Sequence, residues 1–165
     1  MSYVHENFDI VFYRRIAVAP FDNQTTQEFA SGRLRQLLIT ELLLTNTFEV
    51  VEPGEVLRVL SKLQPRNPAS LSDEQIQKLG KEVKAQGVLM GSVNAYEEHR
   101  FGSYIIPEVT LTLRLIDVES GLTVWSVTAT EGGLPMTTQL LGLRPQTMSE
   151  ASKLLIRRVV DSLFF

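Results

Sequence analysis

The sequence predicts a single α/β domain whose sheet is mixed, with a parallel βαβ half, an antiparallel meander and flanking helices. Two patterns predict this class: residues 15–51 have the pattern of strand, helix and strand, and residues 109–115 alternate between apolar and polar side chains. A turn at 117–121 and a strand at 123–131, with Trp125 on its inward side, complete a hairpin. The 165 residues, 44% hydrophobic and 21% charged, suit one domain.

The parallel half begins with a nearly continuous apolar run at residues 15–20, which is typical of a strand buried on both faces. Residues 27–44 place leucines three and four positions apart, as an amphipathic helix does. A second short strand follows at 48–51, and the crossover between the two strands is expected to be right-handed. Residues 1–14 show no clear period, so we expect a lead-in segment before a domain spanning 15–165.

Capping boxes mark the starts of two further helices. Ser72 is followed three residues later by Gln75, and Thr147 by Glu150, so that each pair can satisfy free backbone N–H groups of a first turn. The second of these helices is expected to run close to the C-terminus. The remaining expected elements are helices at 55–63 and 72–84, a strand at 87–93, and loops at 21–26, 97–103 and 132–146.

A search for catalytic or metal-binding residues finds no suitable constellation. The chain has no cysteine, which excludes disulfides, zinc–thiolate sites and cysteine nucleophiles. His5 and His99 lie in the lead-in and in a loop, without a helical partner or a nearby carboxylate motif. Residues 21–25 after the first strand contain no glycine or lysine, so no phosphate-binding loop is expected there. We therefore expect no catalytic residue, no cofactor and no metal.

Aromatic residues gather in two places, before the first strand and around the expected loop at 97–103. Such residues pack at strand ends in many domains, but exposed together they form an apolar patch that a partner can cover. The candidate partner surface consists of Phe12, Tyr13, Tyr96, Phe101 and Tyr104.

Charge argues against a nucleic-acid partner. The formal net charge is −3, and the densest basic pairs, Arg14–Arg15 and Arg157–Arg158, do not extend into a run. No apolar stretch approaches the roughly 18 residues of a membrane-spanning helix. The N-terminus lacks the features of a signal peptide, so the chain is expected to be either cytosolic or a mature segment of an exported protein.

Several stretches, in the same order, resemble the bacterial envelope lipoproteins related to the curli secretion channel subunit, a group that includes the lipoprotein activators of penicillin-binding proteins. The matching stretches are RIAVAPFDN at 15–23, FEVVE at 48–52, GVLMGSV at 87–93, and LIDVESG at 115–121 followed by Trp125. The resemblance covers roughly residues 15–131.

This resemblance implies a non-enzymatic periplasmic protein that binds an envelope protein or assembles with itself, as a homo-oligomer. It also implies an outer-membrane anchor on a lipidated cysteine, which this chain lacks, so membrane contact would come only through a lipid outside it. The curli subunit spans the membrane with added hairpins, each strand of which needs about 9–11 residues. The expected loops at 97–103 and 132–146 are too short, or too rich in proline and glycine, so we expect no pore.

Two alternatives remain open. Small mixed α/β domains of this kind also occur in anticodon-binding proteins, so a cytosolic nucleotide- or RNA-binding module of anticodon-binding-domain-like fold is one; it would need a basic face. An enzyme with an acid site near Glu97 and Glu98 is the other. That alternative would need a pocket joining the two carboxylates to a group with a perturbed pKa.

Overall fold

The computed structural model describes residues 1–133 and 146–165, so most of the expected loop at 132–146 lies outside the described residues. In chain order the elements are β1 (Ser2–Val4), the 3₁₀-helix η1 (Ile10–Phe12), β2 (Arg15–Val18), β3 (Asp22–Asn23), α1 (Ala30–Leu44), β4 (Glu49–Val50), α2 (Pro53–Leu63), α3 (Asp73–Glu82), β5 (Gly87–Phe101), β6 (Tyr104–Asp117), β7 (Thr123–Gly132) and α5 (Met148–Asp161).

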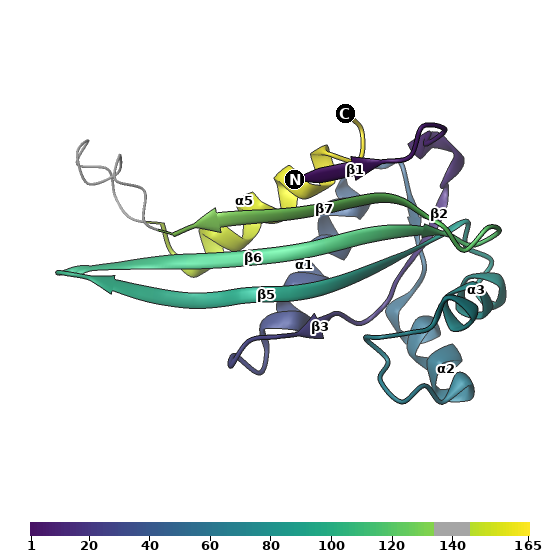
Figure 1. Cartoon of the computed structure of the whole chain (residues 1–165), viewed down its shortest axis with the longest axis horizontal. Helices are drawn as coiled ribbons and strands as arrows, with labels where there is room; N and C mark the ends of the chain where they lie inside the picture. Colours follow the sequence, from purple (N-terminus) through teal and green to yellow (C-terminus); the bar gives the residue numbers. More distant parts are fainter. Residues whose placement is uncertain (134–145) are drawn as a thin grey trace.

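One mixed sheet organises the molecule (Figure 1). Its strands lie in the order β1-β7-β6-β5-β2-β4, and β3 pairs with β5 beside this path. β2 is parallel to β4 and to β5, whereas β5, β6, β7 and β1 pair antiparallel. The expected fold class, a single domain with a parallel βαβ half and an antiparallel meander, is confirmed.

The sheet carries a hydrophobic core on each face. Residues of α1 and α5 form the first core with one face, and residues of α2 and α3 form the second core with the other. β2 and the residue after it alternate between the two, with Ile16 and Val18 in the first core and Ala17 and Ala19 in the second. This double burial explains why residues 15–20 are apolar almost without interruption.

Both capping boxes form as expected. The Gln75 N–H donates to Ser72 Oγ at 3.2 Å, and the Ser72 N–H donates to the Gln75 side chain at 3.0 Å. The Thr147 and Glu150 pair makes the same two bonds at 3.2 and 2.9 Å. Each pair satisfies two backbone donors that the first helical turn leaves without an intrahelical partner.

The expected lead-in segment is part of the folded domain. β1 pairs with β7 at an edge of the sheet, and Ile10 and Tyr13 lie in the first core. Residues 1–14, expected as a lead-in segment, thus contribute an edge strand and two core residues to the domain. Three paired residues and one 3₁₀ turn are too short to produce a hydrophobic period, which is the signal that sequence reasoning uses.

The largest departure from expectation is at residues 97–103, which are not a loop. β5 and β6 continue as a ladder from Gly87↔Asp117 to Phe101↔Tyr104, joined by a two-residue turn. Gly102 has a φ of +59°, and Ser103 is not among the residues with positive φ, which is the pattern of a type II′ hairpin turn. The expectation that residues 97–103 form a loop too short for a membrane-spanning hairpin is therefore wrong.

Candidate functional site

The distal part of this hairpin, residues 96–109, is called the hairpin arm below. β7 pairs with β6 as far as Glu108↔Gly132, and β3 pairs with β5 only at Ser92 and Val93. In the described part of the chain, the end of the arm is therefore a two-stranded ribbon. Figure 1 shows its tip extending beyond α1 and α5 along the long axis of the molecule.

The tip of the arm is apolar and exposed. Phe101 and Tyr104 lie directly opposite each other across the turn and share one face of the ribbon, whereas Ile105 points to the other face, opposite Arg100. The exposed fractions of Phe101, Tyr104 and Ile105 are 49%, 49% and 46%. Tyr96, at the root of the arm, is partly buried against the first core. Of the five candidate surface residues, Phe101 and Tyr104 therefore lie together at the apolar tip. Tyr96 packs the root of the arm against the first core.

The other two candidate residues lie elsewhere. Phe12, in η1, is 60% exposed, but Tyr13 is buried and its hydroxyl donates to Asp117 Oδ1 at 3.1 Å. Asp117 pairs with Gly87 at the start of β5, whereas the tip is fourteen residues further along that strand. At about 3.3 Å per residue the two places are roughly 45 Å apart. The five residues do not make one surface.

Tyr13 leads to a prediction on alkaline stability. Burial, and then the adjacent Asp117 carboxylate, raise the pKa of the Tyr13 phenol above its ordinary value of 10.0. The folded chain thus keeps a proton that the unfolded chain loses, so this contribution to stability is intact below about pH 10 and falls above it. Between pH 8 and about pH 10.5, the free energy of unfolding measured with urea should fall less in Tyr13→Phe than in the wild type. An equal loss in both proteins would contradict this.

His99 is not isolated, contrary to expectation. Its Nε2 lies 2.9 Å from Glu108 Oε2 and 3.6 Å from Glu97 Oε1. The three ligand atoms all lie within 4.8 Å of one another, so these residues could hold a metal ion. Residues 97 and 99 share one side of β5 because side chains alternate along a strand. Sequence reasoning would have found this pair had residues 97–103 been recognised as strand.

The adjacent acids Glu97 and Glu98 do not form a catalytic pair. Neighbouring residues in a β-strand point to opposite faces, and Glu98 lies opposite Pro107 while Glu97 lies opposite Glu108. The enzyme alternative needed these two carboxylates to converge on one pocket, and the strand geometry separates them.

Of the four arginines in the two basic pairs that could suit a nucleic acid, Arg15, Arg157 and Arg158 lie in ion pairs, whereas Arg14 is exposed. The ion pairs are Arg15–Glu49, Arg15–Glu55, Arg157–Glu41 and Arg158–Glu131. Arg15 also donates from its Nε to the Val83 carbonyl oxygen at 2.9 Å. Guanidinium groups paired with carboxylates of the same chain have part of their charge neutralised before a phosphate could approach.

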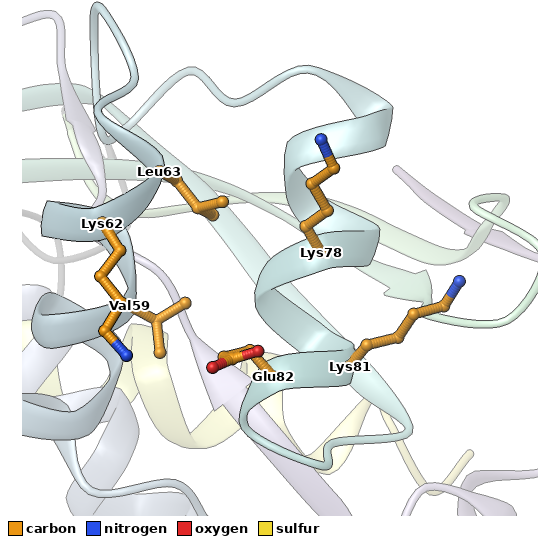
Figure 2. Close-up of a pocket in the computed structure, with 6 residues that line it drawn as sticks. All are labelled: Val59, Lys62, Leu63, Lys78, Lys81 and Glu82. Carbon is orange, nitrogen blue, oxygen red and sulfur yellow. The ribbon is translucent and has the colours of Figure 1, made fainter.

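A hollow of about 330 Å³ lies between α2 and α3 and is lined by Val59, Lys62, Leu63, Lys78, Lys81 and Glu82. Val59, Leu63 and Glu82 point into the gap, whereas Lys81 extends away from it (Figure 2). Lys62 and Lys81 lie in the last turns of their helices, where a cation stabilises the helix dipole. Lys78 pairs with Glu74 at 2.9 Å. The helices themselves thus account for these lysines.

A comparison with protein families decides the affiliation. The model of the family described as peptidoglycan-synthase activator LpoB matches residues 9–130, which is more than half of the chain. The chain belongs to the LpoB family. The resemblance to bacterial envelope lipoproteins is thereby confirmed, and the family's description is that of an activator of an enzyme. In this LpoB-family protein the matched region includes the whole hairpin arm.

Solved structures show the same fold. The PelC dodecamer from Paraburkholderia phytofirmans matches with a TM-score of 0.68 at 20% identity, covering 99% of this chain and 94% of that one. Lipoprotein GNA1162 from Neisseria meningitidis matches with a TM-score of 0.65 at 18% identity, covering 92% and 98%. The LpoB C-terminal domain from Salmonella enterica matches with a TM-score of 0.55 at 19% identity, covering 71% and 81%.

No curated protein sequence matches this LpoB-family chain. Among the described residues, none of the helices combines the length and the apolar character that crossing a membrane requires.

Proposed function

We propose that this LpoB-family protein is a non-enzymatic lipoprotein of the periplasm, anchored to the outer membrane by a lipid outside this chain. The protein binds an envelope protein through the tip of the hairpin arm. Family membership supports the envelope setting and the role as a binding partner. The observation that carries the binding site is the exposure of Phe101 and Tyr104 side by side on one face of the tip.

The tip has the properties of a binding anchor. Aromatic side chains bury much apolar area and lose little conformational entropy on binding, which is why they dominate the energetics of many interfaces. Clustered apolar side chains at the end of a ribbon are exposed to water unless a partner covers them. The partner class that the family supports is a peptidoglycan synthase.

Capture from envelope extracts tests the site. The bait is the chain as it stands, compared with a Phe101→Ser/Tyr104→Ser double variant. We expect the double variant to retain on the order of a tenth of the captured partner or less, since loss of interface anchors typically costs about 2 kcal/mol or more. The matched control is Phe12→Ser, which removes an aromatic side chain that is 60% exposed, in η1 and far from the tip; it should capture as the wild type does.

Equal capture by all three baits, or loss only with Phe12→Ser, would contradict the proposal. Light scattering on the same proteins separates a foreign partner from a second copy of this chain. PelC, a structural relative, is described as a dodecamer. If the wild type is oligomeric and the double variant monomeric, the tip binds a second copy instead.

We do not adopt the alternative of nucleotide or RNA binding, because three of the four arginines considered for it pair with carboxylates of the fold and a lone Arg14 is no basic face. We further propose that the chain is not itself a pore. Charged residues occupy both faces of the arm, with Glu98 on one face and Glu97 and Glu108 on the other. A hairpin of this kind offers no uncharged face to lipid.

A further inference from the structure

Two carboxylates lie in an arrangement that is unfavourable by itself. The register of β5 and β6 places Glu97 directly opposite Glu108. Like charges directly opposite each other destabilise an antiparallel pair. The placement occurs at the root of a two-stranded ribbon, a structure that is marginally stable in isolation. Some compensating group is needed at this position of the arm.

The described residues provide no permanent cation for this purpose. Neither Glu97 nor Glu108 has a lysine or arginine among its ion-pair partners in the described chain, and the only basic group at both is the His99 ring. With a neutral imidazole, the three residues carry two negative charges. The Glu108 and His99 side chains are only 30% and 38% exposed. Glu97 is 59% exposed, so Glu108 is the more desolvated of the two carboxylates. Two negative charges this close together attract a divalent cation.

The donor atoms match a transition metal in type and in spacing. One imidazole nitrogen with two carboxylate oxygens is a ligand set that suits Zn²⁺, whereas Ca²⁺ and Mg²⁺ prefer oxygen ligands alone. Ligands at about 2.1 Å from a tetrahedral zinc ion are roughly 3.4 Å apart. His99 Nε2 lies 2.9 Å from Glu108 Oε2 and 3.6 Å from Glu97 Oε1, one below and one above that spacing. All three ligand atoms lie within 4.8 Å of one another.

We propose that Glu97, His99 and Glu108 form a binding site for a divalent transition-metal cation, which joins β5 to β6 at the root of the hairpin arm. Binding uses the Nε2 lone pair, so the imidazole proton resides on Nδ1. Three protein ligands leave one tetrahedral position for water or for a group of a partner. The site does not depend on the tip binding a partner, and each can fail without the other.

Zinc titration of the metal-stripped chain, in competition with a chromophoric chelator, tests the site. We expect saturable binding of one Zn²⁺ per chain, weakened on the order of tenfold or more in His99→Gln and in Glu108→Gln, since each loses one of three ligands. Glu98→Gln is the matched control, because it removes the same charge from the opposite face of β5. His5→Gln removes the other histidine of the chain. Both controls should bind as the wild type does.

Amide hydrogen exchange reports where the metal acts. Zn²⁺ should slow exchange in the arm of the wild type and of Glu98→Gln, but not of His99→Gln, whereas Mg²⁺ should have no such effect. The proposal is overturned if the wild type shows no saturable zinc binding, or if His5→Gln or Glu98→Gln loses as much affinity as His99→Gln. Equal protection by Mg²⁺ would overturn the assignment of a nitrogen ligand. Circular dichroism of each variant verifies that the domain is folded.

Discussion

Replacing Trp125 by alanine is expected to lower the free energy of unfolding by about 3–5 kcal/mol, the range for a large buried aromatic. Trp125 is 0% exposed and belongs to the first core, where β7 faces α5. Its indole Nε1–H donates to the Ser162 carbonyl oxygen at 3.2 Å, so one side chain fills the core and holds the end of α5. Urea unfolding followed by circular dichroism measures the change.

Two variants make this result specific. Trp125→Phe keeps part of the ring but leaves the Ser162 carbonyl without its donor, and about 1–3 kcal/mol should be lost. Tyr3→Ala alters an aromatic residue of the same sheet that is 52% exposed, and should change stability by no more than about 0.5 kcal/mol. If Trp125→Ala and Tyr3→Ala behaved alike, the assignment of Trp125 to the core would be wrong.

Gly80→Ala should destabilise the protein although alanine favours helices. A Cβ at Gly80 would lie 2.2 Å from Val118 Cγ2 and 2.8 Å from its Cγ1. Val118 is buried and β-branched, so its side chain cannot easily rotate away. Overpacking of this kind costs about 1–3 kcal/mol. Thermal and urea unfolding of the single variant give the magnitude.

Gly32→Ala is the matched control, because Gly32 also lies in a helix but has nothing within 4 Å of an added Cβ. There the higher helix propensity of alanine should raise stability by about 0.5–1 kcal/mol. Val118→Ala should relieve the clash, so the Gly80→Ala/Val118→Ala double variant should be more stable than the sum of the two single changes implies. Strict additivity would show that the close approach of α3 to Val118 is not what constrains Gly80.

Elements that depend on neighbouring residues in the chain were predictable. The capping boxes at Ser72 and Thr147 form because both partners of each bond lie within one turn. The alternation at 109–115 predicted β6 because one face of that strand is buried under α5 and the other face is more exposed to solvent. Trp125 was expected inside on the same grounds, and it lies there.

The hairpin arm escaped prediction because its distal residues, 97–105, have no buried face that would impose a period. Glu97 and Glu98 are consecutive charges, and the Gly102–Ser103 pair has the composition of a loop as readily as of a two-residue turn. β1 and β3 were missed because strands of two or three residues are below the length at which alternation is visible.

The βαβ half, the capped helices and the β6–β7 hairpin were thus determined by local patterns in the chain, and the envelope family by the order of its short motifs. Which side chains meet was decided only by folding. Register across β5 and β6 brings Glu108 to Glu97 and His99, and the length of the same hairpin separates Phe101 and Tyr104 from Tyr13. Contacts between distant residues depend on strand pairing, which leaves no signature in a single stretch of sequence.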